Sequence, residues 1–366
     1  MKITHVISDS NVGGAGILLS SLISELKNEF EFEVLLPRGS KLIERLPASS
    51  VKITEVNTCA DKSFDTHDIG KLTRYFKRSA PDVVHTHASL SARVAARLAG
   101  VSKCLSTRHC AYSTEGMKRI RPMQRIIYNF FTDITVSTAR CATKNLLSEG
   151  LTPEKIVTIY NGVRVDKKHD TNADDRLLKK LNIPKGSRII GSVARLENVK
   201  GQDLIIRAAS KILSDFDDIY FLIIGDGSSA EEYKSLAARL GVRDRVIFTG
   251  YVSHPEEYQR IFYLNVNASR GTETSCLAIS ECMGLGIPTV ASDFGGNTEM
   301  IEDGKNGLLF KKDNVFDIEK KIRAVLSSAE LHRRLSLGAE EIYADRYSIG
   351  KMISQYRDLY RSLNPS

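Results

Sequence analysis

Short apolar blocks alternate with stretches of helical spacing along the first 163 residues of the chain. Residues 2–7 (KITHVI) have the continuous apolar character of a buried strand, and the apolar positions between Ile17 and Leu26 share one helical face. The same alternation continues to residue 163. It predicts further strands at residues 32–37, 82–87, 103–109, 133–137 and 156–163, and further helices at 91–100, 122–130 and 138–150.

A second alternation begins after a polar, charged and turn-forming stretch at residues 166–187, which is typical of an interdomain connection. Apolar strands bounded by glycine and separated by amphipathic helices indicate a parallel sheet covered on both faces. The segments are 188–194, 202–213, 219–227, 230–241, 246–252, 263–269, 276–286, 287–293 and 307–310.

The fold class is therefore α/β, with two doubly wound domains joined by a linker. The first domain is expected at residues 1–163, the linker region at 164–187 and the second domain at 188–345. The terminal stretch 346–366 keeps apolar and aromatic helical spacing, and we expect this helix to return to the first domain and complete it.

Composition narrows the class of protein. Of the 366 residues, 42% are hydrophobic and 26% charged, as in a soluble globular protein. No apolar run approaches the ~20 residues that span a bilayer, and the first residues do not have the pattern of a secretory signal. Six scattered cysteines without C-x-x-C spacing predict reduced thiols in the cytoplasm, and they exclude a disulfide framework or a zinc-ribbon site.

The net charge of +8 belongs wholly to the first half of the chain. Residues 1–165 hold 23 Lys and Arg against 15 Asp and Glu, whereas the remainder holds 29 of each. Residues 93–125 alone contain eight bases and one acid, Glu115. In the predicted helix behind Pro122, Ile126, Ile127 and Phe130 are expected to pack in the core. The basic loop at 115–122, with Lys118, Arg119 and Arg121, is expected to contact an anionic acceptor or a membrane.

Glycine-rich loops follow strands in both halves. Gly13, Gly14 and Gly16 lie between a strand and a helix, and Gly225 and Gly227 end another strand. Bare backbone amides at such a place can bind an anion, but a tight turn needs glycine equally. The spacing is not G-x-G-x-x-G and no acidic residue ends the next strand, so a dinucleotide site is disfavoured.

Three charged positions follow strand ends in the second half. Arg195 and Lys200 could clamp a diphosphate, since ligands bind at the carboxyl ends of parallel strands; two solvated surface charges remain the alternative. The stretch ETSCLAISE places Glu273 in a loop and Glu281 about two turns inside a helix that is expected to begin near Ser275. Glu281 could accept ribose hydroxyls, and the helix amides phosphate oxygens.

Metal sites are predicted to be absent. Asp215 and Asp217 precede a strand, as in a surface turn, and the strand-end pair His85 and His87 lacks an evident third ligand.

The ordered motifs resemble the retaining glycosyltransferases of family 4, the group 1 transferases, whose GT-B architecture consists of two facing Rossmann-like domains. The residues that carry the resemblance run through nearly the whole chain: Gly13-Gly14, His109, Asn161-Gly162-Val163, Arg195 with Lys200, Gly225-Asp226-Gly227, Phe248-Thr-Gly250, the E-x7-E pair Glu273 and Glu281, and Gly295-Gly296 with Glu299.

The resemblance implies roles for individual residues. Arg195 and Lys200 would hold the donor diphosphate, Glu281 the ribose, and Glu273 the donor sugar. His109 would face the reacting sugar, although a structural histidine is an alternative. Further donor contacts would come from Gly13, Gly14, Gly225, Tyr251, Val252, Thr274, Ser275, Cys276 and Leu277. Thr274, where the family usually has glycine, and the following Ser-Cys depart from its pattern and leave the donor sugar open.

The expected function is transfer of a sugar from a UDP- or GDP-sugar, with retention and without a metal, to a saccharide or lipid-linked acceptor. Its place would be cell-surface polysaccharide, lipopolysaccharide or glycan synthesis in a bacterium. The protein would be cytoplasmic, peripheral on the inner face of the membrane. Alternatives are a nucleotide-sugar epimerase of the same fold and a nucleic-acid-binding protein, but aromatic residues are scarce among the bases of 93–125.

Overall fold

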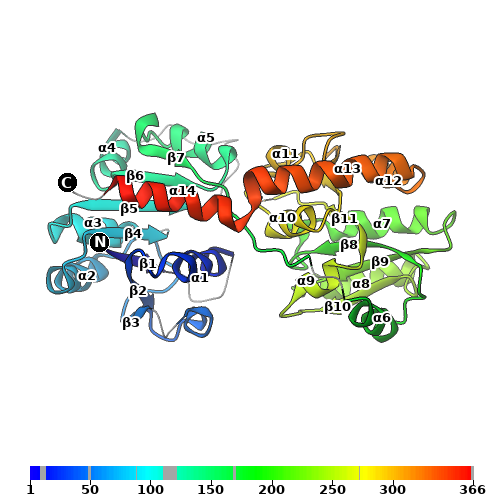
Figure 1. Ribbon diagram of the computed structural model, residues 1–366, viewed down its shortest axis with the longest axis horizontal. Coiled ribbons are helices and arrows are strands. Elements are labelled where there is room, and N and C mark those ends of the chain that lie inside the picture. The colour runs from blue at the N-terminus through cyan, green and yellow to red at the C-terminus, as the bar shows by residue number, and fades with distance from the viewer. Residues whose placement is uncertain are drawn as a thin grey trace. The chain divides into compact units, whose positions relative to one another are not determined.

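The computed structural model describes residues 1–8, 14–47, 51–87, 89–109, 122–167, 170–271 and 273–363, apart from the side chains of 122–124. The chain divides into two compact units. The first unit comprises Met1–Gly162 and Ile349–Ser366, and the second unit Val163–Ser348. Each unit consists of a parallel sheet flanked by helices (Figure 1).

The described part of the first unit forms a seven-stranded parallel sheet in the order β3-β2-β1-β4-β5-β6-β7. Its strands are β1 (Lys2–Ile7), β2 (Glu31–Pro37), β3 (Lys52–Val56), β4 (Val83–His87), β5 (Lys103–Arg108), β6 (Ile134–Ser137) and β7 (Ile156–Thr158). The helices are α1 (Gly14–Leu26), α2 (Thr66–Ser79), α3 (Leu90–Leu98), α4 (Pro122–Phe130), α5 (Arg140–Ser148) and α14 (Ile349–Ser362), with short helices at Lys41–Arg45 and Pro153–Lys155.

Local sequence accounts for these boundaries. The Asp65 side chain accepts a hydrogen bond from the His67 amide and caps α2, which ends where Ala80 adopts a left-handed conformation. The central strand β1 is buried along nearly its whole length, as expected for a strand covered on both faces. Helix α1 begins at Gly14, earlier than expected, so Gly14 and Gly16 lie in the helix and not in a loop.

Helix α14 belongs to the first unit although it follows the whole second unit in sequence. Figure 1 shows it in red along the first sheet, and the Tyr360 hydroxyl lies 2.8 Å from Nδ1 of His85 on β4. Arg357 and Arg361 pair with Glu29 near the end of α1. The helix therefore covers one face of the sheet.

Helix α4 differs from the expectation. Ile126 and Phe130 are each 67% exposed, so the prediction that they pack in the core is wrong. The period of an amphipathic helix shows which residues share a face but not whether that face is covered. Ile126 and Phe130 are the two most exposed large apolar side chains among the described residues of the first unit.

The described part of the second unit forms a six-stranded parallel sheet in the order β10-β9-β8-β11-β12-β13. The strands are β8 (Arg188–Val193), β9 (Ile219–Ile224), β10 (Val246–Gly250), β11 (Phe262–Asn267), β12 (Thr289–Ser292) and β13 (Gly307–Phe310). The helices are α6 (Thr171–Lys180), α7 (Gln202–Ile212), α8 (Ala230–Arg239), α9 (Pro255–Gln259), α10 (Leu277–Gly284), α11 (Asn297–Met300), α12 (Val315–Leu326) and α13 (Ala329–Ile342), with short helical turns at Asn198–Lys200 and Tyr343–Tyr347.

The expected linker 164–187 contains helix α6. Asp170 caps it, and Leu177 and Leu178 pack against the core of the second unit around Leu222. The polar face of this short helix explains why the stretch has the composition of a connection.

None of the described helices is long and apolar enough to cross a membrane. Among the described cysteines, Cys59, Cys104, Cys276 and Cys282 form no disulfide.

Candidate active site

Each sheet has one place where the strand order reverses, and such switch points form crevices at the carboxyl ends of the strands. In the second sheet the reversal lies between β8 and β11. Arg195 and Lys200 follow β8, and Glu273 follows β11. In the first sheet the reversal lies between β1 and β4, and His87 ends β4. Arg195, Lys200 and Glu273 therefore follow the strands beside the reversal of the second sheet, whereas the predicted His109 follows β5, one strand farther from the reversal of the first sheet.

Glycines let the loops after β8, β9 and β11 approach one another closely. A Cβ at Gly225 would lie 2.0 Å from the carbonyl oxygen of Ala194, and one at Gly227 would lie 2.4 Å from that of Leu196. Gly201, which has a φ of +71°, leaves no room for a Cβ beside the Ala268 carbonyl. The glycines of the GDG motif thus serve loop packing, which brings the Arg195–Lys200 loop against the end of β11.

The loop after β12 supports Glu273 in the same way. The amide of Gly296 donates a hydrogen bond to the carbonyl oxygen of Glu273, at 3.0 Å. A Cβ at Gly296 would lie 1.8 Å from the carbonyl oxygen of Thr274, and one at Gly295 would lie 2.5 Å from that of Glu273. The two glycines are therefore required to hold the backbone before α10.

Lys200 and Glu273 form a buried ion pair. Nζ of Lys200 lies 2.8 Å from Oε2 of Glu273, and the two side chains are 17% and 8% exposed. The hydroxyl of Ser269 donates to the same carboxylate oxygen at 2.7 Å. Burial by itself lowers the pKa of Lys200, but the adjacent carboxylate outweighs it and raises that pKa above its usual value. The ammonium is therefore charged and held in place.

Arg195 and Tyr251 are far more accessible. The Arg195 guanidinium donates to Glu197 at 2.7 Å while its side chain is 70% exposed. Tyr251 follows β10 and is 74% exposed, whereas Val252 packs against the apolar core. The amide of Gly225 bonds to the Gly250 carbonyl, which ties the ends of β9 and β10 together. Both exposed side chains can reach a ligand without breaking a buried contact.

Helix α10 begins at Leu277, two residues later than expected, so Glu281 lies about one turn inside it and not two. Cys276 is the N-cap residue but makes no capping hydrogen bond through its side chain. The buried Ser275 hydroxyl has no partner among the described residues. An anion at this helix start would satisfy both the free amides and the hydroxyl.

The Cys276 thiol is not a nucleophile. Burial, followed by the charge of Glu273, raises the pKa of Cys276 to about 12. Its sulfur accepts a hydrogen bond from Asn267 at 3.1 Å. A thiol in such surroundings stays protonated and packs the loop.

Glu281 is partly buried in α10. Burial raises its pKa above the usual value, and a hydrogen bond from Gln259 opposes the effect. Gln259 is itself fully buried and also donates to the carbonyl of Ala278. A carboxylate kept partly desolvated in this way is a strong acceptor for ligand hydroxyls.

His109 directly follows β5 and is partly buried. Its Nε2 lies 2.9 Å from Nδ1 of His87, and burial lowers the pKa of His109 to about 4. Its Nδ1 has no hydrogen-bond partner among the described residues. Gly14 lies in the same unit, at the start of α1, while Gly13, Lys118, Arg119 and Arg121 lie outside the described residues.

Sequence reasoning missed several polar residues of these two regions. Ser269, Gln259 and His5 each contact a predicted residue or its immediate partner. The signal for His5 was present, because it lies on the strand next to His85 and His87, but strand register was needed to bring them together.

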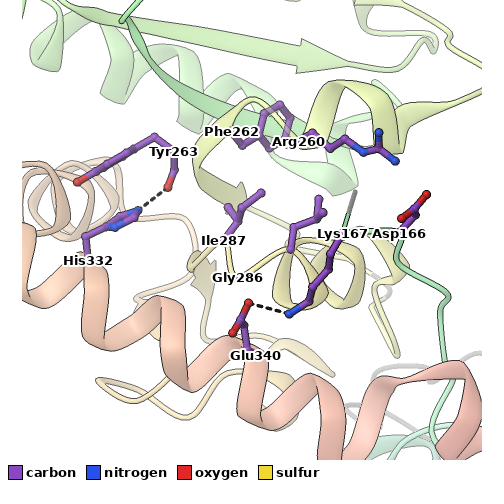
Figure 2. A pocket seen from close by; sticks show the side chains of 10 residues that line it. Asp166, Lys167, Arg260, Phe262, Tyr263, Gly286, Ile287, His332 and Glu340 are labelled. Atoms are coloured by element: carbon purple, nitrogen blue, oxygen red, sulfur yellow. Dashed lines mark hydrogen bonds and ion pairs between the residues drawn. The ribbon is translucent and has the colours of Figure 1, made fainter. Parts of the chain in front are cut away.

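A separate cavity of about 430 Å³ lies at the opposite edge of the second sheet, where β11 and β12 begin. Figure 2 shows Lys167 paired with Glu340 and His332 bonded to the Tyr263 carbonyl around it. Ligands of open α/β sheets bind at carboxyl ends, so this cavity is not the expected active site.

Comparisons with known families follow the division of the chain. A model described as "Glycosyl transferases group 1" matches residues 173–341, and one described as "Glycosyltransferase Family 4" matches residues 12–167. The N-acetyl-alpha-D-glucosaminyl L-malate synthase of Bacillus anthracis is 23% identical, over 96% of this chain and 94% of that protein. The UDP-Gal:alpha-D-GlcNAc-diphosphoundecaprenol alpha-1,3-galactosyltransferase of Escherichia coli is 24% identical, over 98% and 96%.

Among solved structures, Anabaena Alr3699/HepE in complex with UDP superposes with a TM-score of 0.86 at 19% identity, covering 99% of this chain and 100% of that one. At 19% identity, this similarity shows the fold alone.

Proposed function

Because this chain belongs to the family 4 glycosyltransferases, also called the group 1 transferases, and has their GT-B fold, we propose a finer function. It would transfer a sugar from a UDP- or GDP-sugar, with retention, to a saccharide or lipid-linked acceptor. The resemblance, the fold class and the glycosyltransferase activity predicted from the sequence are confirmed by the family matches. The observation that carries the finer proposal is the buried Lys200–Glu273 pair beside the start of α10.

The donor would bind at the carboxyl edge of the second sheet. Lys200 and Arg195 would hold the diphosphate together with the free amides of α10, because cations and a helix start both favour negative charge. Leu277 is the first residue of α10, and the backbone of Thr274, Ser275 and Cys276, which leads into the helix, would also contact the donor. Gly13, Gly14 and Gly225 would line the approach to the phosphates.

The nucleoside would extend toward β10. Glu281 would accept the two ribose hydroxyls, and Tyr251 would lie against the base with Val252 beneath it. The exposed ring of Tyr251 supports this role, since a stacking surface must be free before the base arrives. The HepE complexes contain UDP or UDP-glucose, which supports a nucleoside diphosphate as the leaving group.

Lys200 and Glu273 satisfy one another until the donor binds. A diphosphate carries more negative charge than one carboxylate, so it would draw Lys200 toward itself and free Glu273 to accept hydroxyls of the donor sugar. The hydrogen bond from Ser269 keeps Glu273 from being left without a partner. The same two side chains can thus neutralise each other before the donor binds and contact the diphosphate and the sugar afterwards.

Rate acceleration follows from charge development. As the bond between the sugar and the phosphate breaks, the sugar gains positive charge and the diphosphate negative charge. Lys200 and the helix amides therefore bind the transition state more strongly than the donor, and losing one such group costs ~3–4 kcal/mol. A phosphate oxygen of the leaving group would accept the proton of the acceptor. No metal is required on this scheme.

The first unit would receive the acceptor, with His109 facing the reacting sugar. We place the protein at the inner face of the cytoplasmic membrane, where Lys118, Arg119 and Arg121 would meet anionic lipid at ~1 kcal/mol each. The exposed Ile126 and Phe130 on α4 support this placement. The Escherichia coli relative is named for GlcNAc-diphosphoundecaprenol, a lipid-linked diphosphate sugar. This supports an acceptor of that kind in cell-surface glycan synthesis.

A screen of UDP-, GDP- and ADP-sugars by thermal unfolding tests the proposal. The correct donor at a hundredfold excess over its Kd should add ~2.7 kcal/mol to the free energy of unfolding, with no effect of EDTA. Incubation of that donor with candidate acceptors should release nucleoside diphosphate in proportion to product. Conversion of the sugar without any acceptor would instead support an epimerase of the same fold.

A further inference from the structure

Four buried polar side chains form a hydrogen-bonded group next to the ion pair of the candidate active site, and we call them the buried polar cluster. They come from the ends of two neighbouring strands and from the start of a short helix: Asn267 ends β11, Ser269 follows it, Ser292 ends β12 and Asn297 begins α11. Each is at most 7% exposed. Polar groups buried this deeply require hydrogen-bond partners, so their contacts show what the cluster holds in place.

The cluster holds the backbone of Ser269 from both sides. The Ser269 amide donates to Oδ1 of Asn267 at 3.1 Å, and the Ser292 hydroxyl donates to the Ser269 carbonyl at 2.6 Å. Nδ2 of Asn297 donates to Oδ1 of Asn267 at 3.2 Å and to the Ser292 hydroxyl at 3.0 Å. One side-chain amide, from the segment after β12, therefore contacts both groups that hold Ser269.

Backbone groups fix the direction of these bonds. An amide N–H can only donate and a carbonyl can only accept. The Asn267 atom at the Ser269 amide must therefore be oxygen, and the Ser292 hydroxyl must use its hydrogen on the Ser269 carbonyl. Nδ2 of Asn267 then faces the sulfur of Cys276, which accepts at 3.1 Å. Asn297 thus meets two acceptors, and only its NH2 group has the two hydrogens that they require.

The remaining oxygen of Asn297, Oδ1, is buried and has no partner among the described residues. A buried oxygen without a partner costs stability, which offsets what the two donated bonds contribute. Without Asn297, moreover, Asn267 and Ser292 would keep their bonds to the Ser269 backbone. Stability therefore gives little reason for an amide at this position, whereas the orientation of Ser269 gives one.

Ser269 connects the buried polar cluster to the ion pair. Its hydroxyl donates to Oε2 of Glu273 at 2.7 Å, and Lys200 contacts the same oxygen at 2.8 Å. Both hydrogen bonds fall on Oε2, so Oε1 of Glu273 is left without a partner among the described residues. A carboxylate held at one oxygen from two sides presents its other oxygen in a fixed direction.

We propose that Asn297 is a positioning residue of the transfer reaction. Through Ser269 it fixes the Glu273 carboxylate so that Oε1 is free to accept a hydroxyl of the donor sugar. Asn297 is fully buried and touches no substrate itself. The contact between Oε1 and the sugar rests on the proposed function, whereas the arrangement of the buried polar cluster does not. Asn297 should therefore matter for the reaction only while Ser269 has its hydroxyl.

Amide hydrogen exchange of the whole protein without ligand, resolved to single residues by NMR, tests the cluster. Asn297→Leu keeps a branched side chain but removes both donated bonds. The Ser269 amide should then exchange several-fold faster than in the wild type, while the amides of β8 and β9 keep their rates. Asn297→Ala, which cannot overfill the site, should give the same result. Unchanged exchange at Ser269 in both variants would overturn the proposal.

The matched control is Asn265→Leu. Asn265 is a buried asparagine on the same strand as Asn267, and its Nδ2 donates to the Thr289 hydroxyl at 3.1 Å. This variant also loses a buried side-chain amide, but one outside the buried polar cluster, so exchange at Ser269 should stay as in the wild type. Equal acceleration at Ser269 in the control would show a general loosening of the strand and would refute a special place for Asn297.

Activity tests whether Asn297 acts through Ser269. Asn297→Leu should lower kcat about tenfold, because the sugar is misplaced, while the Kd for the nucleoside diphosphate stays the same. Ser269→Ala should lower kcat similarly, and the double variant should be no slower than Ser269→Ala alone.

Two outcomes would refute the positioning role: a kcat of Asn297→Leu equal to that of the wild type, or losses that multiply in the double variant. Failure of the wild type to transfer any nucleotide sugar would refute the proposed function but leave the exchange result standing.

Discussion

The carboxyl edges of the two sheets solve the same structural problem with opposite chemistry. At the switch point of the second sheet, the polar groups are ions, with Lys200 and Glu273 neutralising one another in a nearly dry loop cluster. Beside the switch point of the first sheet the polar groups are neutral rings and hydroxyls linked in series. Both arrangements satisfy buried polar atoms, but only one of them carries charge.

The difference matches what each edge would bind. A leaving diphosphate is charged and becomes more so during the reaction, so it requires fixed cations. A sugar has no net charge, and it is oriented by donors and acceptors whose direction is known in advance. At the position that we propose for His109, a charged imidazole would oppose the developing positive charge of the sugar. Burial lowers the pKa of His109 to about 4 and would avoid that repulsion.

The largest expected effect comes from breaking the ion pair. Lys200→Ala would remove the cation that we propose stabilises the leaving diphosphate, and it leaves the Glu273 carboxylate buried without its cation. We expect a 10²–10³-fold lower kcat, measured with the correct donor. The free energy of unfolding should fall by about 3–5 kcal/mol in denaturant titrations.

The matched control is Lys234→Ala, which breaks an exposed Lys–Glu pair on the second unit. It should change stability by less than about 1 kcal/mol and leave kcat as in the wild type. Similar losses in both variants would mean that the Lys200–Glu273 pair has no special place in the site.

Acid should destabilise the first unit more than the second. Burial holds the folded pKa of His5, His85, His87 and His109 below the unfolded value, so their stabilisation is present above about pH 6.5 and is lost as the pH falls below it. Uptake of one proton by each of the four rings on unfolding would give a slope of up to about 5.5 kcal/mol per pH unit. The contribution of Lys200 depends on pH in the opposite direction. Because its folded pKa is raised, its stabilisation is lost only at alkaline pH.

Hydrogen exchange resolved by peptide, at pH 7.5 and pH 5.5, measures this separation. Amides of β1, β4 and β5 should lose protection at pH 5.5 while those of β8, β9 and β11 keep it. Equal loss in the two sheets would show that the buried histidines His5, His85, His87 and His109 do not set the acid stability of the first unit.

Glu281→Gln should weaken binding while strengthening the fold. Desolvation of the carboxylate raises its pKa, so the charged form destabilises the folded protein above that pKa, and the neutral amide relieves it. The lost charged acceptor for ribose should weaken nucleoside diphosphate binding by about 1.5–3 kcal/mol, or roughly 10–150-fold. Calorimetry and thermal unfolding read the two effects, and a lower Tm would contradict the stability sign.

The smallest effect on stability is expected at α4. The double substitution Ile126→Ser with Phe130→Ser should change the free energy of unfolding by less than about 0.5 kcal/mol per site, because both side chains are exposed. Recovery with anionic vesicles in co-sedimentation should nevertheless fall. Phe316→Ser, an equally exposed phenylalanine of the second unit, is the control, and equal recovery of all three proteins would remove α4 from the membrane proposal.

Local patterns were sufficient for the second unit. The six strands of the second sheet, the loop that carries Arg195 and Lys200, and the helix that carries Glu281 could all be predicted, because each depends on a few consecutive residues. In the first sheet, β3 was not predicted. The start of α10 was displaced to Leu277, since the backbone of Glu273 and Thr274 packs closely against Gly295 and Gly296 of a distant loop. Spacing along the chain cannot show that constraint.

The first unit required information that a sequence pattern does not contain. His85 and His87 were recognised as a pair on one face, but His5 is about 80 residues away and joins them only through the register of β1 with β4. The exposure of Phe130 depends in the same way on what does or does not cover α4. Burial and long-range pairing are properties of the whole fold.

The return of α14 to the first sheet sets an order of events during synthesis. His5 leaves the ribosome among the first residues, but its hydroxyl partner on α14 follows only after the intervening Val163–Ser348 has been made. At ordinary translation rates that interval is roughly 10–40 s. Throughout it the nascent first sheet has an uncovered polar face, and a chain released early would keep that defect permanently.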